Sequence, residues 1–218
     1  MLAGVLTSDA SLGARLAMPV GETPGPAKTH WYAALAPEGS ESALAARLKA
    51  VLSPAVLDDA FVISRERWTR RAGAWQLNRV QMYPGYVWLA SRDLAGLTQA
   101  LRGLSFPVRL AGGPGAKGTA ALEGEAQAFY AGALDASHTV RASAAVLDAH
   151  GALRVTQGPL VGCEASIVDY NRHKRTAYVR ISQAEGGLVE CLALDVRDAA
   201  GPSPADLRLS QGGDIEPS

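Results

Sequence analysis

The sequence predicts an α+β domain followed by a small all-β barrel. Between residues 29 and 134, strand-like runs alternate with helix-like segments, which favours an antiparallel sheet flanked by helices. From residue 151 to 200 only short strand-like runs occur, separated by glycine and asparagine, and this spacing is typical of a small barrel. Residues 135–150, rich in alanine, serine and aspartate, are interpreted as a linker whose last part could pair with the barrel strands.

The first strand and helix are predicted from local spacing. Residues 31–36 form a short apolar run, which suits a buried strand. Ser40 or Ser42 can cap the next helix, and Pro54 enforces its end. The apolar residues of this helix that recur at helical spacing are Leu44, Leu48, Val51 and Leu52.

A β-hairpin and a further strand come next. Residues 60–68 and 74–81 have strand character, and the Arg-Arg-Ala-Gly sequence at 70–73 offers a turn between them. Residues 83–90 are rich in aromatic and β-branched residues, with Pro84 near the start, where a missing N–H can be tolerated. We therefore expect three consecutive strands.

Two helices complete the first domain. Asp93 is expected to cap a helix with Leu94, Leu97 and Leu101 on one face, and Leu97 is expected in the core. After a loop rich in glycine and proline, residues 122–134 predict the last helix. The expected strands of the barrel are 153–156, 165–170, 176–181, 188–192 and 194–197.

The ends of the chain and its charge narrow the class of protein. Residues 1–28 predict a flexible arm and residues 201–218 a disordered tail. Lys plus Arg and Asp plus Glu both number 21, so any contact with nucleic acid must be local. No secretory signal opens the chain and no apolar run approaches the ~20 residues that span a bilayer. We expect a cytoplasmic protein with Cys163 and Cys191 reduced.

No pattern in the sequence indicates catalysis, a cofactor or a metal. A Gly-x-Ser-x-Gly elbow and paired carboxylates in an apolar setting are both missing. The loop at 112–119 resembles a phosphate loop only superficially, because Lys117 precedes Gly118 instead of a Ser or Thr that opens a helix. The four histidines and two cysteines do not have metal-ligand spacing. We expect a binding protein, not an enzyme.

Two motifs carry a resemblance to a known family. Trp31-Tyr32 opens the first strand, and Tyr83-Pro84-Gly85-Tyr86-Val87 begins the last strand of the first domain. Gly158-Pro159-Leu160-Val161-Gly162 precedes a strand in the second domain. In this order, residues 29–200 resemble NusG-type transcription elongation factors, whose N-terminal domain is followed by an SH3-like KOW barrel.

The resemblance implies a non-enzymatic, monomeric factor that binds the clamp helices of the RNA polymerase β′ subunit and bridges toward the gate loop of the β subunit. Such binding promotes processive elongation and antitermination. The basic run at 171–175 most resembles the LoaP-type specialised paralogues, whose KOW domain contacts an RNA hairpin. General factors bind Rho or ribosomal protein S10 and usually have Phe where Leu160 stands, so these partners are expected less.

The resemblance assigns a polymerase-binding surface to the first domain. Tyr83, Tyr86 and Trp88 are expected to project from one face of a strand, although such aromatic residues commonly pack in a core. The expected polymerase-binding residues are Leu35, Tyr83, Pro84, Gly85, Tyr86 and Trp88. Thr98 and Gln99 lie where relatives contact the gate loop, although a solvated helix face explains them as well.

Nucleic-acid contacts are expected at two basic turns. The hairpin arginines, Arg70, Arg71 and Arg79, either lie near upstream or non-template DNA or form a solvated tip. The second turn is either polar and solvated, with Asn171 at positive φ, or grips RNA by phosphate contact and stacking. Its residues are Asn171, Arg172, His173, Lys174 and Arg175, and the preceding KOW turn contains Gly158, Pro159, Leu160 and Gly162.

Two alternative functions remain open. A general NusG-type factor would couple polymerase to Rho and ribosomal protein S10. A KOW-containing ribosome-associated protein would instead bind structured ribosomal RNA, but the Tyr83 and Tyr86 motif in an α+β domain disfavours it.

Overall fold

The structure, a computed structural model, describes residues 28–112, 121–122, 124–183 and 187–198. The expected tail at 201–218 and all but Lys28 of the expected arm lie outside these residues, as does most of the loop at 112–119. In the described part, no helix is long and apolar enough to cross a membrane. The chain has mixed α and β structure, as predicted, with three sheets and three α-helices among the described residues.

The first sheet has four strands in the order β2-β5-β1-β6. Its strands are β1 (His30–Leu35), β2 (Asp59–Phe61), β5 (Tyr86–Ser91) and β6 (Arg109–Leu110). β1 and β5 pair antiparallel from His30 opposite Ser91 to Leu35 opposite Tyr86. Because side chains alternate along a strand, Val87 and Leu89 of β5 face one hydrophobic cluster and Trp88 faces another.

Helices α1 (Glu41–Val51) and α2 (Leu94–Arg102) contribute to the cluster that contains Val87 and Leu89. Leu48 of α1 and Leu97 of α2 are fully buried there, as their helical spacing predicts. The Asp93 carboxylate accepts the Gly96 N–H at 2.9 Å, which confirms the expected cap. Ser40 precedes α1, but its hydroxyl donates to the Pro37 carbonyl at 2.7 Å and does not cap the helix.

The predicted β-hairpin is confirmed. Strands β3 (Ser64–Arg71) and β4 (Ala74–Gln81) pair antiparallel along their whole length. Ala72 and Gly73 connect them with φ of 49° and 81°, the positive values that two-residue hairpin turns require. A short strand, β7 (Thr139–Val140), adds to the other edge of β3 only at Ser64 and Arg65.

A second sheet of five strands forms the C-terminal part of the described chain, in the order β10-β11-β12-β8-β9. The strands are β8 (Ser143–Leu147), β9 (Leu153–Gln157), β10 (Ile167–Asn171), β11 (Thr176–Arg180) and β12 (Val189–Asp198). A short 3-10 helix, η1 (Glu164–Ser166), precedes β10. We call residues 28–134 the N-terminal unit and residues 143–198 the β unit.

Two expectations about the β unit are wrong. Residues 135–150 are not simply a linker, because they contain β7 and also β8, which pairs with β9 and β12. The inward side chains of β8 are the small Ser143 and Ala145, so the strand lacks the large apolar residues that usually reveal one. The two strands expected at 188–192 and 194–197 are one strand, β12.

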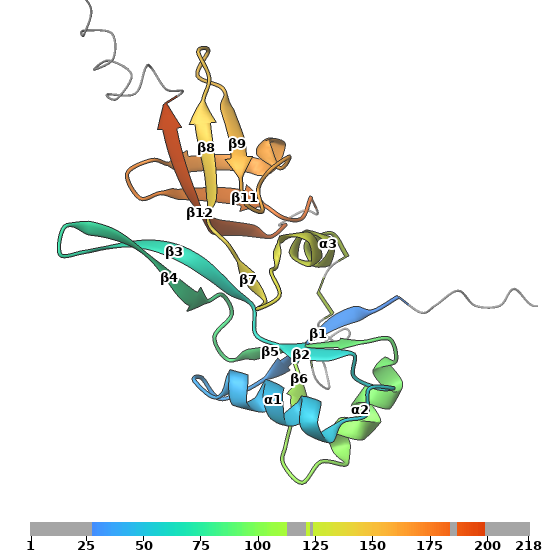
Figure 1. Cartoon of the computed structure of the whole chain (residues 1–218). Helices are drawn as coiled ribbons and strands as arrows, with labels where there is room; N and C mark the ends of the chain where they lie inside the picture. Colours follow the sequence, from blue (N-terminus) through green and yellow to red (C-terminus); the bar gives the residue numbers. More distant parts are fainter. Residues whose placement is uncertain (1–27, 113–120, 123, 184–186, 199–218) are drawn as a thin grey trace, which may run out of the picture.

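The two units share a hydrophobic cluster. Helix α3 (Gly124–Ala133) lies between the first sheet and the β unit, and the β3–β4 hairpin extends beside the β unit (Figure 1). The cluster joins Trp88 of β5 and Tyr130 of α3 to Leu192 and Leu194 of β12. Burial against α3 and β12 therefore decides which residues of β5 remain accessible.

Candidate functional site

Leu35 and Tyr86 form an exposed hydrophobic pair at one end of the first sheet. They are directly opposite each other in the β1–β5 register. Leu35 is 44% exposed and Tyr86 is 38% exposed, and Pro84 beside them is exposed as well. These three residues of the expected polymerase-binding set are accessible.

The backbone beside this pair is fixed by Gly85 and Glu41. Gly85 has a φ of 82°, and its N–H donates to the Glu41 carboxylate at 2.7 Å. Its carbonyl accepts the Ala36 N–H at 2.9 Å. This N–H contact from Gly85 is the main cause that lowers the pKa of the Glu41 carboxyl, which stays ionised at neutral pH. Glu41 therefore holds the turn that presents Pro84 and Tyr86.

The requirement for glycine at position 85 comes from its backbone angle. A Cβ there would meet the nearest atom, the Ala36 carbonyl oxygen, at 3.7 Å, which is an ordinary contact. A positive φ, however, strains residues with a side chain. Of the two explanations that the sequence left open, close approach and a β-bulge, neither is needed.

The expectation that Tyr83, Tyr86 and Trp88 project from one face is wrong. β5 begins at Tyr86, so Tyr83 lies in the preceding turn. Tyr86 and Trp88 are two residues apart and share a face, but Trp88 is only 7% exposed. Its ring packs edge-on against Tyr83, with the centroids 5.7 Å apart. Trp88 is a core residue in this arrangement.

Tyr83 is covered by α3 and β12. Its hydroxyl donates to the Glu190 carboxylate at 2.6 Å and lies 2.6 Å from the Tyr130 hydroxyl, which can donate to it. Arg65 of β3 lies 3.6 Å from the same carboxylate. Burial, followed by the hydrogen bond to Glu190, raises the pKa of Tyr83. The expected polymerase-binding set therefore splits into an exposed part and a part that the β unit covers.

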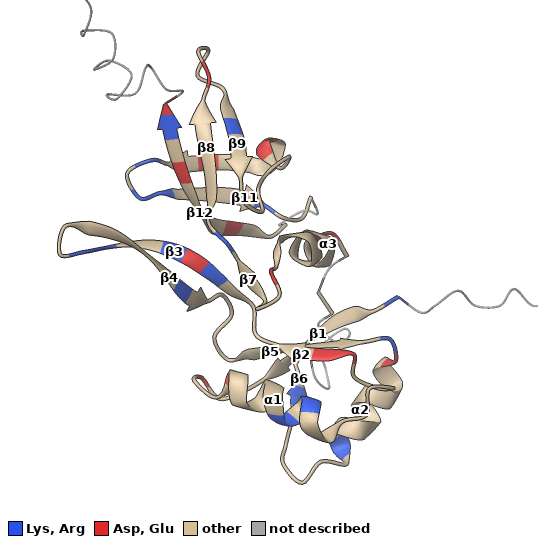
Figure 2. Cartoon of the chain, viewed as in Figure 1, with Lys and Arg blue, Asp and Glu red and all other residues tan. Residues whose placement is uncertain are grey.

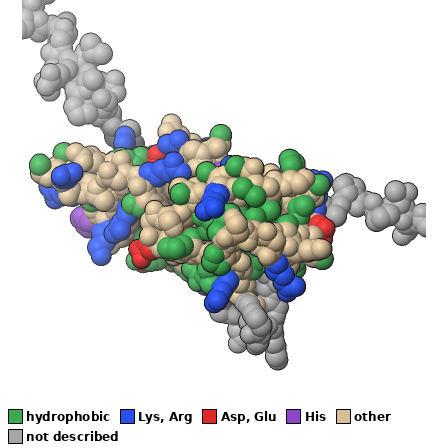
Figure 3. Space-filling view, turned by 90° about the horizontal axis from the view of Figure 1, so that it is seen from below, with side chains coloured by type: hydrophobic (Ala, Val, Ile, Leu, Met, Phe, Trp, Pro, Cys, Tyr) green, Lys and Arg blue, Asp and Glu red, His purple; other side chains and the backbone are tan. Residues whose placement is uncertain are grey.

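Thr98 and Gln99 lie on α2, as predicted, with Leu97 buried beneath them. The Thr98 hydroxyl donates to the Leu94 carbonyl at 2.7 Å, while Gln99 is exposed. Both line a shallow hollow of about 590 Å³. Figure 3 views the molecule from the end that carries α1 and α2, where hydrophobic side chains are interspersed with lysines and arginines.

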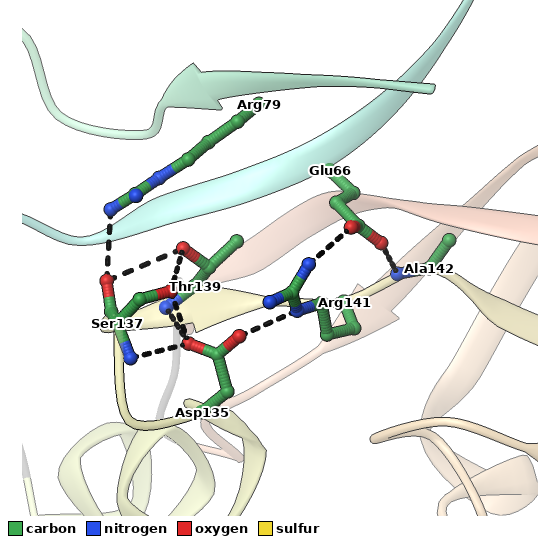
Figure 4. A network of polar contacts seen from close by, with 7 residues as sticks. All are labelled: Glu66, Arg79, Asp135, Ser137, Thr139, Arg141 and Ala142. Atoms are coloured by element: carbon green, nitrogen blue, oxygen red, sulfur yellow. Dashed lines mark hydrogen bonds and ion pairs between the residues drawn. The ribbon is translucent and has the colours of Figure 1, made fainter. Parts of the chain in front are cut away.

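The hairpin arginines differ in their surroundings. Arg70 and Arg71 are exposed at the tip, and the Arg70 Nε donates to the Gly73 carbonyl at 3.3 Å. Arg79 instead donates from Nη2 to the Ser137 carbonyl at 2.8 Å (Figure 4). Arg70 and Arg71 thus remain candidates for contact with DNA, whereas Arg79 holds the segment after α3.

That segment is fixed by a polar network (Figure 4). The Asp135 carboxylate accepts bonds from the hydroxyl and N–H of Ser137, the Thr139 N–H and the Arg141 side chain. These contacts, the Ser137 hydroxyl first, lower the pKa of the Asp135 carboxyl. Arg141 also pairs with Glu66 of β3 at 2.8 Å. The network ties the hairpin to the start of the β unit.

The basic turn at 171–175 joins β10 to β11. The Asn171 side chain accepts the Lys174 N–H at 2.8 Å. The residue with positive φ is Arg175, at 52°, and not Asn171 as expected. Arg172 pairs with Asp198 at 2.9 Å. Figure 2 shows that this turn and the hairpin tip carry their basic residues on the same side of the molecule.

Arg175 connects the basic turn to the hairpin. Its guanidinium carbon lies 4.8 Å from the Trp68 ring centroid and 5.1 Å from that of Trp75. Its Nε is 3.5 Å from Asp195 of β12. His173 and Lys174 are exposed and have no ion pair within the described residues. Of the expected RNA-contacting cations, Arg172 and Arg175 are therefore engaged within the chain.

The KOW turn comes after β9 and is shaped by Gly158. With φ of 92°, a Cβ there would lie 2.6 Å from the Ser143 hydroxyl oxygen and 2.8 Å from the Ala142 carbonyl oxygen, so only glycine fits. Leu160 is fully buried, whereas Val161 is exposed. The other two expected residues of this turn are Pro159, which is half-buried, and Gly162, which is exposed. A partner therefore cannot contact the Leu160 side chain in this arrangement.

Sequence reasoning missed the residues that join the two units. Glu190 and Arg65 are inconspicuous members of strand patterns, and the contact between Tyr83 and Glu190 spans 107 residues. Trp68 and Trp75 were placed on the hairpin without a role, and no local signal indicates that Arg175 packs on them.

No protein-family model matches the chain, and the search of curated proteins found no match. Within the part of the chain that the structure describes, no group of three or more His, Cys, Asp or Glu residues could hold a metal ion. The site is thus defined by its own geometry: an exposed hydrophobic pair on the N-terminal unit and a basic turn on the β unit.

Proposed function

We propose that this chain is a NusG-type transcription elongation factor that promotes processive antitermination. Its N-terminal unit binds the clamp helices of RNA polymerase, and its β unit contacts nascent RNA or a partner protein. The observation that carries the proposal is the exposed pair Leu35 and Tyr86 within the motif at 83–87.

The geometry of this pair suits the recognition of helices. Paired β-strands hold both side chains in place, so binding orders few additional groups. Tyrosine is a frequent anchor at protein interfaces, and apolar surfaces that receive helices are a recurring recognition mode. Tyr83 and Trp88 are covered, so the proposed contact rests on Leu35, Tyr86 and the adjoining Pro84.

The basic turn supports the contact with RNA. His173 and Lys174 are exposed beside Tyr178, which is 44% exposed on β11. Cations that meet phosphates release counterions, and exposed aromatic rings stack on unpaired bases. The chain has no net charge, so this local arrangement must supply the attraction.

The test is retention of core RNA polymerase by the immobilised full chain. Tyr86→Ala should weaken polymerase binding by about 30-fold, because an interface anchor contributes about 2 kcal/mol or more. Tyr178→Ala is the matched control, since Tyr178 has a similar exposure but lies on the β unit. Equal polymerase retention by the wild type and both variants would refute the proposed surface.

A second candidate is a general factor that binds Rho and ribosomal protein S10. The burial of Leu160 favours keeping it, because the difference between Leu and the usual Phe is not displayed on the surface. Binding of purified Rho and S10 to the full chain separates the two candidates. Polymerase occupancy mapped with and without the protein then shows whether the effect is genome-wide or confined to single operons.

A further inference from the structure

The β3–β4 hairpin and the β unit enclose a groove, and we propose that it binds single-stranded nucleic acid. The groove has a volume of about 330 Å³, and residues of both units line it. That volume is within the range of about 300 to 1,000 Å³ typical of ligand sites. This proposal deepens the contact with nucleic acid proposed above and rests on it, but it adds a site that neither basic turn forms alone.

Aromatic rings line the groove from opposite sides. Trp68 and Trp75 come from the hairpin, where Trp68 is opposite Leu77 and Trp75 is opposite Arg70, so both indoles lie on one face. Arg175 lies over both rings and restrains them. Tyr178 lines the groove from β11 and is 44% exposed. Unpaired bases stack on such rings whatever their sequence.

The free charge of the groove is positive. Arg65 and Glu66 line it, but each already has a partner of opposite charge, Glu190 and Arg141 respectively. Arg67 and Lys174 also line it, are exposed, and have no ion pair within the described residues. One cation comes from the hairpin and the other from the basic turn, so a bound backbone would contact both units.

These features favour a single strand over a duplex. The rings of Trp75 and Tyr178 are recessed between two walls of the protein, and only an unpaired base exposes its face to such rings. Nascent RNA and an exposed DNA strand share this chemistry. The experiment therefore compares RNA and DNA directly.

The experiment measures fluorescence anisotropy of labelled oligonucleotides with the full chain. The probes are an oligouridylate of about 12 nucleotides, the matching oligothymidylate and an RNA duplex of the same length. Both single strands should bind more tightly than the duplex. Tighter binding of oligouridylate assigns the groove to RNA, and tighter binding of oligothymidylate assigns it to DNA.

Tyr178→Ala should weaken single-strand binding by about tenfold, as expected for the loss of one stacked base. Trp75→Phe should keep most of the affinity, because the replacement preserves a ring. Arg67→Ala and Lys174→Ala should each reduce the slope of log K against log salt concentration by about 0.7. Circular dichroism checks that each variant folds.

The controls are matched in exposure or charge and lie outside the groove. Val168→Ala changes an exposed residue of β10, and Arg154→Ala removes an exposed positive charge from β9. Neither should change the affinity by more than about twofold. Unchanged affinity of folded Tyr178→Ala, or a salt slope unaffected by Arg67→Ala and Lys174→Ala, would overturn the groove.

The outcomes also separate this inference from the proposed function. If Tyr86→Ala leaves polymerase binding intact while Tyr178→Ala loses the single strand, the groove stands and the polymerase surface fails. If Tyr86→Ala loses polymerase while the groove variants bind oligonucleotides like the wild type, the groove fails alone.

Discussion

Tyr83→Phe tests whether the β unit is anchored on the N-terminal unit by a buried polar contact. The substitution keeps the ring against Trp88 but removes the hydroxyl that lies 2.6 Å from both Tyr130 and Glu190. Tyr130 is fully buried, so its own hydroxyl would lose a hydrogen-bond partner. A buried polar group left unsatisfied costs about 1 to 3 kcal/mol, so we expect a loss of about 2 kcal/mol in the free energy of unfolding.

The assay is urea denaturation of the full chain at neutral pH, monitored by tryptophan fluorescence. Tyr86→Phe is the matched control, because the Tyr86 ring is exposed and its hydroxyl makes no hydrogen bond to the described residues. It should change the free energy of unfolding by less than about 0.5 kcal/mol. The double variant with Glu190→Gln should lose less than the sum of its single variants, since both act on one contact.

The pH dependence gives an independent check on Tyr83. The folded state raises the pKa of Tyr83 above its usual value of 10.0, so the folded protein holds the phenol proton more tightly than the unfolded chain. The stability from this effect is present below about pH 10 and is lost as the pH rises further. Tyr83→Phe should flatten this alkaline loss. If Tyr83→Phe is no less stable than Tyr86→Phe and shows the same alkaline profile as the wild type, the anchoring role is wrong.

Two further predictions concern the connections at the start of the β unit. Gly158→Ala should lower the free energy of unfolding by about 3 kcal/mol, because it adds steric overlap to positive-φ strain; Gly162→Ala, with φ of 79° and open space, should cost about 1 kcal/mol. A urea titration that gives equal losses would contradict the contact with Ser143. Asp135→Asn should destabilise the protein above about pH 4, and the difference from wild type should shrink as the pH falls further, because the folded state lowers the pKa of this carboxyl. Thermal melts at several pH values measure this, and a difference that stays constant down to about pH 2 would exclude a role for the ionised carboxylate.

Elements with strong local signals were predicted well from the sequence. The hairpin from Ser64 to Gln81 has a Gly at the turn, and α2 has both an Asp cap and leucines at helical spacing. Each of these signals acts over a few residues, so no knowledge of the rest of the chain is needed. The same holds for Leu48 and Leu97, whose spacing alone places them inside.

The parts that failed depend on contacts between distant segments. β8 has small inward residues and becomes a strand only by pairing with β12, about fifty positions away in the chain. Tyr83 looked like a surface residue because its neighbours Pro84 and Tyr86 are exposed, yet Glu190 and Tyr130 cover it. Periodicity shows which side of a strand a residue faces but not which segment packs there.

The arginines show how a chain without net charge can still attract nucleic acid. Arg141 and Arg172 pair with carboxylates, and Arg79 donates to a backbone carbonyl. Arg67 and Lys174, by contrast, are exposed on one groove and have no ion pair within the described residues. Since paired charges cancel at short range while unpaired ones act on an approaching phosphate, the distribution of partners decides the binding surface. The count of basic residues in the hairpin and the turn therefore overstates their free charge, and the groove between them concentrates what remains.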